Sequence, residues 1–172
     1  MKTNKRKLFK KLLLGLAVLL VIDLLLPTTI ENPVEGCGRE SYNQASFWHP
    51  WGDHCHRGVD IFAHKGTNVH PAIAGIVVAT AHDKGLGGNS ILIMSSGMRF
   101  HYYAHLDQVN THTGAVVNRN SVIGKVGNTG NATDKPPHLH YSIATVIPQG
   151  DWRFDKGVGL FFVNPIKELE RD

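Results

Sequence analysis

The chain has 172 residues, which is enough for one domain of ordinary size and too few for two comfortable ones. Its formal charge is +4, but six of the 18 basic residues lie within residues 1–11, so the rest of the chain carries 12 basic against 14 acidic side chains, a formal charge of −2. The basic excess therefore belongs to the N-terminus, and nothing in the composition favours a nucleic-acid-binding protein.

Residues 1–27 combine a basic tail with an apolar run of 15 residues, Leu12 to Leu26, that contains Asp23. Such a pattern is typical of a signal peptide or of a membrane anchor. The run is longer than most signal-peptide cores and shorter than the roughly 20 residues that span a bilayer comfortably, and no A-x-A cleavage site precedes Pro27. We expect an uncleaved signal anchor, with a cleaved leader and a secreted protein as the alternative.

This N-terminal segment also predicts the location of the rest of the chain. By the positive-inside rule the basic tail stays in the cytoplasm and the remainder lies outside the cytoplasmic membrane, in the cell envelope or periplasm. Residues 28–38 contain turn formers and no hydrophobic periodicity, so we expect a linker there and a single domain over residues 39–172.

Short apolar runs punctuated by glycine fill most of the predicted domain. They cover residues 75–81, 90–96, 98–106, 115–117, 121–127 and 138–147. Closely spaced strands of this kind predict an all-β sandwich, roll or barrel, and the Ser-Ser-Gly turn at 95–97 predicts a hairpin between the strands on either side of it. The C-terminal segment predicts a helix with Asn164 as N-cap and Pro165 at the first helical position.

Two short motifs could contribute ligands to a divalent metal ion. His138 and His140 flank Leu139, so on a strand both imidazoles leave the same face. His56 and Asp60 have the same parity and would also share a strand face, and an imidazole with a carboxylate suits zinc.

Spacing alone does not select these residues, because a chain with 11 histidines produces both patterns by chance. His54 and His56 form a second H-x-H pair, and His49 with Asp53 repeats the H-x-x-x-D spacing. If either His138 or His140 joins His56 and Asp60 as a ligand, the metal site has three protein ligands. This is the number typical of a catalytic zinc that keeps one position for water.

A hydrolase with such a site also needs a general base and a donor that stabilises the developing oxyanion. The candidates are the remaining histidine of the H-x-H pair and His105, at the end of a predicted strand. Strand parity places His105 on the same face as His101 and Tyr103. The alternative for His105 is a structural histidine with its hydrogen bonds satisfied within the fold.

The two cysteines, Cys37 and Cys55, are expected to pair in an exported chain, which would contribute roughly 3 kcal/mol on the chain-entropy model. Two free buried thiols are one alternative. A role of Cys55 as a metal ligand is the other.

The ordered blocks HRGVDIFA, AGIVV, GGNSILI, HYYAHL, IGKVGNTGNATDKPPHLHYSI and NPIKEL resemble the lysostaphin-like, or LytM-type, zinc metalloendopeptidases. The resemblance covers roughly residues 40–169. It selects the block that begins at His56 over the one that begins at His49, since the family motif continues with glycine, an apolar residue, aspartate and isoleucine.

The resemblance implies a single small, mainly antiparallel β-sheet or roll domain that hydrolyses peptide cross-links of bacterial peptidoglycan. It implies Zn²⁺ held by His56, Asp60 and His140, with His105 and His138 beside the attacking water as general base and transition-state stabiliser in an order left open. Many members carry Phe-Glu where this chain has Tyr141 and Ser142, so no role of that glutamate is transferred.

Two other functions compete with this one. A non-catalytic LytM-type regulator that binds and activates another cell-wall hydrolase typically lacks ligands, and none of the expected set is missing here. A lipoyl- or biotinyl-type carrier module needs a lysine at a hairpin tip, whereas Lys125 lies inside a strand-like run. The peptidoglycan peptide, the cytoplasmic membrane and a possible regulatory protein are the expected partners.

Overall fold

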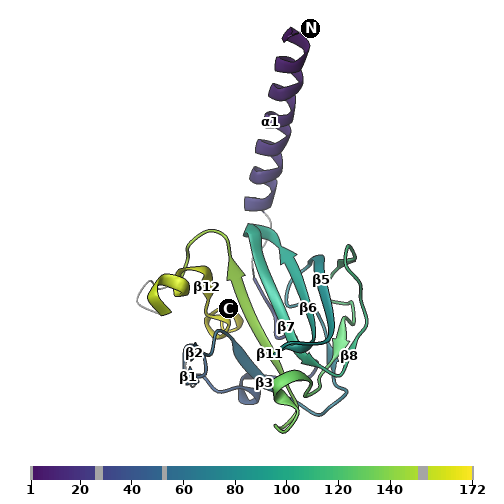
Figure 1. Cartoon of the computed structure of the whole chain (residues 1–172), viewed down its shortest axis with the longest axis vertical. Helices are drawn as coiled ribbons and strands as arrows, with labels where there is room; N and C mark the ends of the chain where they lie inside the picture. The colour runs from purple at the N-terminus through teal and green to yellow at the C-terminus, as the bar shows by residue number, and fades with distance from the viewer. Residues whose placement is uncertain (1, 26–28, 52–53, 151–154, 172) are drawn as a thin grey trace.

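The computed structural model describes residues 2–25, 29–51, 54–150 and 155–171, and it consists of one N-terminal helix and a β domain (Figure 1). The helix α1 (Lys2–Leu25) is rich in leucine and lysine, which both favour helix, and extends away from the domain. None of the described helices combines the length and the hydropathy needed to cross a membrane. The anchor stays a prediction, and its last two residues, 26 and 27, lie outside the described chain.

One antiparallel sheet dominates the domain. Among the described residues this sheet has seven strands. Six of them lie side by side in the order β12, β11, β7, β6, β5 and β9, and the seventh, β3, pairs with residues 138–141 of β11. The strands are β3 (Val59–Phe62), β5 (Gly75–Lys84), β6 (Gly88–Ser95), β7 (Arg99–Leu106), β9 (Val116–Val117), β11 (His138–Thr145) and β12 (Phe162–Val163). The mainly β, antiparallel fold expected from the sequence is confirmed.

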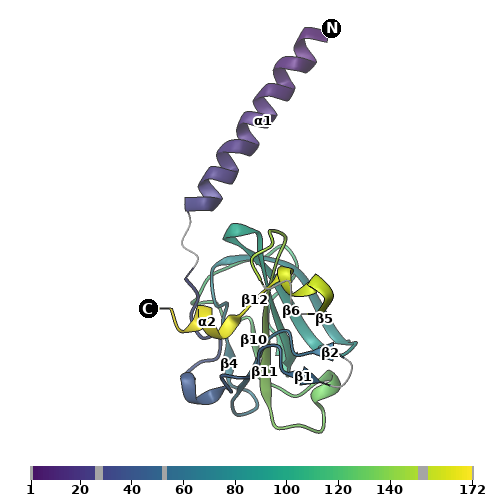
Figure 2. The same ribbon diagram turned by 90° about the vertical axis from the view of Figure 1, so that its left-hand side faces the viewer.

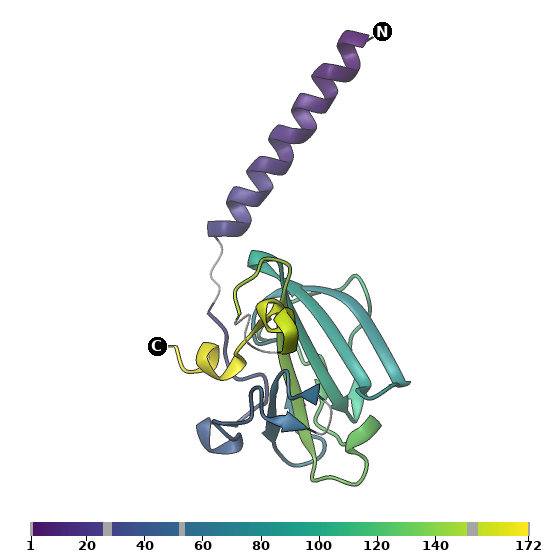
Figure 3. The same ribbon diagram turned by 60° about the vertical axis from the view of Figure 1, so that its left-hand side comes forward.

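Shorter elements surround this sheet. The strands β4 (Asn68–Val69), β10 (Gly124–Lys125) and β8 (Gln108–Val109) form a second sheet, and β1 (Pro50–Trp51) pairs with β2 (His54–Cys55). Short 3-10 segments lie at Arg39–Ser41, Ser96–Met98, Gly130–Ala132 and Asp155–Phe161. In Figure 1 the β1–β2 pair lies on the opposite side of β11 from β5 and β6, and the turned views of Figures 2 and 3 show α1 extending away from the same domain.

The predicted local signals are confirmed at two places. Strands β6 and β7 pair antiparallel around the turn that contains Gly97, whose φ of 70° is the left-handed conformation that glycine adopts without strain. The helix α2 (Pro165–Leu169) begins after Asn164, whose side-chain oxygen accepts a hydrogen bond from the backbone N–H of Ile166 at 3.0 Å. The run at 121–127, by contrast, forms only the two-residue strand β10.

Alternation along β11 separates the two faces of the sheet. Leu139, Tyr141 and Ile143 are fully buried in the hydrophobic core, while His138 and His140 project from the opposite face into a cleft. A strand that is apolar on one face and histidine-rich on the other therefore carries both the core and the candidate site.

The segment expected to be a linker, residues 28–38, packs against the domain from Ile30 onward. Ile30 and Val34 are buried in the core, and the backbone N–H of Glu31 donates to the carbonyl of Ala72 at 2.9 Å. The apolar side chains that make this contact follow neither a helical nor a strand-like period, so the sequence contains no signal of it.

Candidate metal centre and cleft

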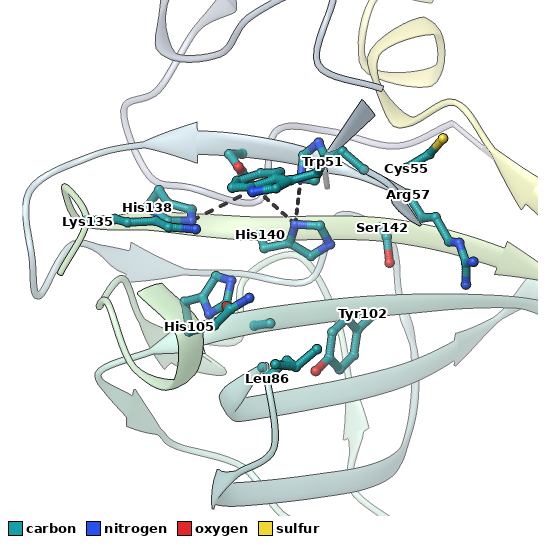
Figure 4. A pocket seen from close by; sticks show the side chains of 15 residues that line it. Trp51, Cys55, Arg57, Leu86, Tyr102, His105, Lys135, His138, His140 and Ser142 are labelled. Atoms are coloured by element: carbon teal, nitrogen blue, oxygen red, sulfur yellow. Dashed lines mark hydrogen bonds and ion pairs between the residues drawn. The ribbon is translucent and has the colours of Figure 1, made fainter. Parts of the chain in front are cut away.

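Three of the residues predicted from the sequence meet at one point. Nε2 of His56 lies 3.0 Å from Oδ1 of Asp60 and 3.0 Å from Nδ1 of His140, and the third side of this triangle, between His140 Nδ1 and Asp60 Oδ1, measures 2.9 Å. Figure 4 shows the cleft, in which dashed lines mark the interactions that reach His140. We call His56, Asp60 and His140 the metal triad.

The strand pairing explains why residues 80 positions apart meet. Asp60 on β3 is directly opposite His140 on β11 in the antiparallel register. His56 lies ahead of β3, so the expectation that His56 and Asp60 share a face of one strand is wrong: a turn, not strand parity, brings them together. Gly58 in this turn leaves room for the imidazole of His140, because a Cβ at position 58 would lie 2.8 Å from Nε2 of that ring.

The protonation states of the triad fit a bound cation. Nδ1 of His56 donates to the carbonyl of Ser46 at 3.0 Å, so Nε2 carries a lone pair. Burial raises the pKa of Asp60, but hydrogen bonds with His140 and His56 outweigh it and hold that pKa well below the usual range. The three facing atoms, Nε2 of His56, Nδ1 of His140 and Oδ1 of Asp60, form a nitrogen, nitrogen and oxygen donor set that converges as zinc requires.

Two further predicted histidines border the triad. Nδ1 of His138 donates to the carbonyl of Pro136 at 2.8 Å, and Nδ1 of His105 donates to the carbonyl of Thr129 at 2.9 Å. In the neutral form each therefore has its lone pair on Nε2. The two ring centroids are 5.0 Å apart, and Nε2 of His138 lies 3.9 Å from Oδ1 of Asp60.

A β-bulge turns His105 toward this cleft. Tyr103 is paired with Ile91 but Leu106 with Asn89, so β7 contains one extra residue, and His105 has a φ of 64°. Tyr103 and Leu106 are buried in the core, whereas His105 lines the cleft. The expectation that His105 shares a face with Tyr103 and His101 is therefore wrong.

Burial also sets the charge of His105. Its side chain is 8% exposed, and desolvation together with the nearby His138 and His140 lowers the pKa of His105 to about 4. The imidazole is consequently neutral near pH 7, which is the form that can accept a proton.

Sequence reasoning missed several side chains that complete the cleft: Trp51, Arg57, Leu86, Tyr102 and Lys135. The indole of Trp51 lies 5.4 Å from the ring of His56, between ring centroids. A side chain at Gly87 would collide with the hydroxyl of Tyr102, so this glycine makes room for it. Tyr102 could have been identified from strand alternation with Ala104; the others come from loops or short strands without a pattern.

Both cysteines are free in the structure, so the expected disulfide is not formed. Sγ of Cys37 lies 3.8 Å from the carbonyl oxygen of Phe62 and packs against the core, and burial raises the pKa of this thiol. Cys55 lines the cleft, but its sulfur points away from the metal triad in Figure 4. The possibility that Cys55 is a metal ligand is not supported by this geometry.

Known structures share this fold. The catalytic domain of lysostaphin from Staphylococcus simulans superposes with a TM-score of 0.60 at 26% identity, over 76% of this chain and 92% of that chain. A zinc-containing peptidase from Vibrio cholerae gives a TM-score of 0.58 at 23% identity, over 84% of this chain and 40% of that chain. The lysostaphin-like fold expected from the sequence is thereby confirmed.

Sequence comparison agrees with the structural one. The L-Ala–D-Glu endopeptidase of Bacillus subtilis (strain 168) is 35% identical over an alignment of 124 residues, and the match covers 64% of this chain and 38% of that protein, so the chain spans well under half of this relative. The model of Peptidase family M23 matches residues 54–152, more than half of the chain, and includes the metal triad, His105 and His138. The chain belongs to peptidase family M23.

Proposed function

We propose that this protein is a zinc-dependent endopeptidase that hydrolyses a peptide bond in the cross-links of bacterial peptidoglycan. The observation that carries the proposal is the triangle of two nitrogen atoms and one oxygen atom that can bind a metal ion, with sides of 2.9 to 3.0 Å, beside two histidines that have Nε2 available. Family membership and the relative described as an L-Ala–D-Glu endopeptidase support a peptide of the cell wall as substrate.

Zinc is the cofactor of M23 peptidases, and the residues that would hold it are His56, Asp60 and His140. Three protein ligands leave one coordination position open, as in other catalytic zinc sites. Zinc in such a site polarises the carbonyl of the scissile bond and makes a water molecule acidic enough to attack near neutral pH.

We assign the proton transfers to the two bordering histidines. His105 is neutral and has Nε2 available, so it accepts the proton of the attacking water as general base. His138, with Nε2 3.9 Å from the Asp60 carboxylate, donates from Nε2 when protonated and stabilises the developing oxyanion. The carbonyls of Thr129 and Pro136 fix the orientation of these two rings.

The proposed enzyme acts in the cell envelope. Residues 1–27 would anchor it in the cytoplasmic membrane with the domain of residues 39–172, together with the packed segment before it, on the outer side. A regulatory protein could control access to the cleft. A non-catalytic regulator would have no need for the five site residues, all of which are present.

The test is to incubate the full chain, loaded with zinc in detergent, with purified peptidoglycan and to identify the released fragments by mass spectrometry. We expect new amino termini that disappear with a chelator and return when zinc is added back. The variant His140→Ala is the control, since it removes one ligand and should release nothing. A folded, zinc-loaded protein that releases no fragment would contradict the proposal and favour the regulator.

A further inference from the structure

Two neighbouring segments of the domain contain no Asp, Glu, Lys or Arg. Residues 85–98 include β6 and most of the turn after it, and residues 136–150 include β11 and the loop after it. Both strands end beside the same residue of β7, because Ser95 and Thr145 are each directly opposite Arg99 in the antiparallel register. The two uncharged segments therefore meet at one end of the sheet, around Arg99.

Exposed apolar side chains gather at this end. Ile76 on β5 is directly opposite Met94 on β6, Met98 lies in the turn that follows β6, and Val146 and Ile147 follow β11. All five are among the exposed large apolar residues of the chain, and Ile147 is 50% exposed. We call them the apolar end. Single exposed apolar residues are normal, but a contiguous set of them marks an interaction surface.

The polar groups at the apolar end already have partners within the fold. The side chain of Arg99 is 11% exposed, and its guanidinium donates to Oε2 of Glu168 and to Oε1 of Gln149, both at 2.9 Å. The backbone N–H of Ile147 donates to Oγ1 of Thr145 at 3.2 Å, and that hydroxyl donates to the carbonyl of Ile147 at 3.0 Å. Such satisfied groups lower the cost of contact with lipid, which offers few hydrogen bonds.

The N-terminal helix approaches the domain at the same end. Figure 1 shows the lower end of α1 above the turn between β6 and β7, and α1 comes close to the 3-10 segment Ser96–Met98. Only residues 26–28 connect Leu25 to Thr29, and this connection spans at most about 14 Å. A membrane that holds α1 would therefore lie within reach of the apolar end.

We propose that the apolar end lies on the lipid surface of the membrane in which α1 is anchored. The inference rests on the envelope location given in the proposed function and adds a second contact with the membrane. An apolar, uncharged surface next to an anchor suits the boundary between lipid headgroups and acyl chains.

This contact would also fix the height of the reaction centre above the membrane. From Thr145, at the apolar end, back to His140 of the metal triad, β11 rises about 17 Å, at about 3.3 Å per residue. The cleft would then face wall peptides that lie close to the membrane.

The experiment measures lipid contact at single positions of the full chain. The substitutions Cys37→Ser and Cys55→Ser remove the native thiols, and Met98→Cys or Ile147→Cys introduces one cysteine that is labelled with the environment-sensitive dye NBD. The protein is reconstituted in vesicles of phosphatidylethanolamine and phosphatidylglycerol. Circular dichroism before labelling checks that each variant is folded.

The matched control is the same label introduced by Phe62→Cys. Phe62 is 46% exposed, close to the value for Ile147, but it pairs with His138 at the opposite end of β11. We expect lipids with a spin label on the acyl chain to quench the dye at positions 98 and 147 at least about threefold more than at position 62. Equal quenching at all three positions, or a chain that does not stay with the vesicles, would overturn the inference.

A pair of valine variants tests whether the apolar side chains themselves make the contact. With the dye at position 98, Val146→Ser should reduce the quenching, because it removes apolar area from the apolar end. Val122→Ser removes an exposed valine outside the apolar end and should not change it. A dye whose emission shifts to the blue without quenching by lipid would show that a second copy or another protein covers this surface, and would also overturn the inference.

The outcomes separate the inference from the proposed function. If the vesicle-bound protein releases peptidoglycan fragments but lipid does not quench the dye at positions 98 and 147, the membrane contact is wrong and the endopeptidase remains. If lipid quenches the dye but no fragment is released, the membrane contact stands and the proposed reaction is wrong.

Discussion

His101 and His105 lie four residues apart on β7 but serve opposite faces of the sheet. Nε2 of His101 lies 2.8 Å from the hydroxyl of Ser95, and Nδ1 lies 2.7 Å from the hydroxyl of Tyr141, so both ring nitrogens are used inside the core. His105 uses only Nδ1 within the fold and presents its other nitrogen to the cleft.

The two histidines are nevertheless alike in burial and charge. Desolvation, with a contribution from Arg99, lowers the pKa of His101 to about 3, close to the value of about 4 for His105. A buried histidine with a depressed pKa is therefore not by itself a catalytic candidate. The distinguishing feature is a nitrogen that the fold leaves available.

The largest effect should come from His105→Ala. Loss of the general base should lower kcat about 10²- to 10⁴-fold, while zinc content stays at one ion per chain because no ligand is removed. Zinc by atomic absorption and turnover on peptidoglycan fragments are measured on the same sample. Turnover near the wild-type rate would show that this histidine is structural, like His101.

The reverse pattern is expected for His101→Ala. The hydroxyls of Ser95 and Tyr141 would each lose a buried partner, so the free energy of unfolding should fall by about 2–4 kcal/mol. Denaturation in urea measures this change, and the folded fraction should keep wild-type kcat. A large loss of kcat at unchanged stability would contradict the division of the two faces.

The pH dependence of stability sharpens the same comparison. The pKa of His101 is lowered in the folded state from 6.5 to about 3, so between these pH values the unfolded chain binds a proton that the folded chain does not. His101 therefore lowers the free energy of unfolding as the pH falls through that window, by about 1.4 kcal/mol per pH unit. The difference between wild type and His101→Gln in urea midpoints from pH 7 to 4 isolates the slope; parallel curves would contradict it.

A smaller effect is expected at Gly58, on the cleft side. A methyl group there would approach the ring of His140 and the carbonyl of Tyr141, so Gly58→Ala should weaken zinc binding about tenfold, roughly 1.4 kcal/mol. Competition with a chromogenic chelator measures the affinity. Gly15→Ala, at a glycine in α1 with open space around it and without a positive φ, serves as the control for the glycine-to-alanine change; equal losses in both variants would show that crowding of His140 is not the cause.

Much of the site could be predicted because β11 is regular. Alternation from His138 to Ile143 assigns histidines to one face and apolar residues to the other, and the structure follows it. The hairpin turn near Gly97 and the cap at Asn164 are equally local signals. Local patterns of this kind were sufficient for the β class of the fold and for a short list of candidate ligands.

The parts that could not be predicted depend on irregular backbone or on distant loops. The bulge at His105 reverses strand parity within a single residue, and the turn before Val59 replaces the strand expected at His56. Trp51, on β1, and Lys135, in the loop before β11, meet only because segments far apart in the sequence converge on the cleft. The burial of Ile30 likewise follows from tertiary packing and not from any periodicity.

The central claim is that His56, Asp60 and His140 hold one zinc ion with His105 and His138 beside it but not bound to it. Anomalous diffraction at the zinc edge from crystals of the zinc-loaded protein tests this directly. We predict one peak within about 2.0–2.2 Å of Nε2 of His56, Oδ1 of Asp60 and Nδ1 of His140, with no fourth protein ligand. A peak elsewhere, or one in which His105 or His138 completes the coordination, would contradict the account.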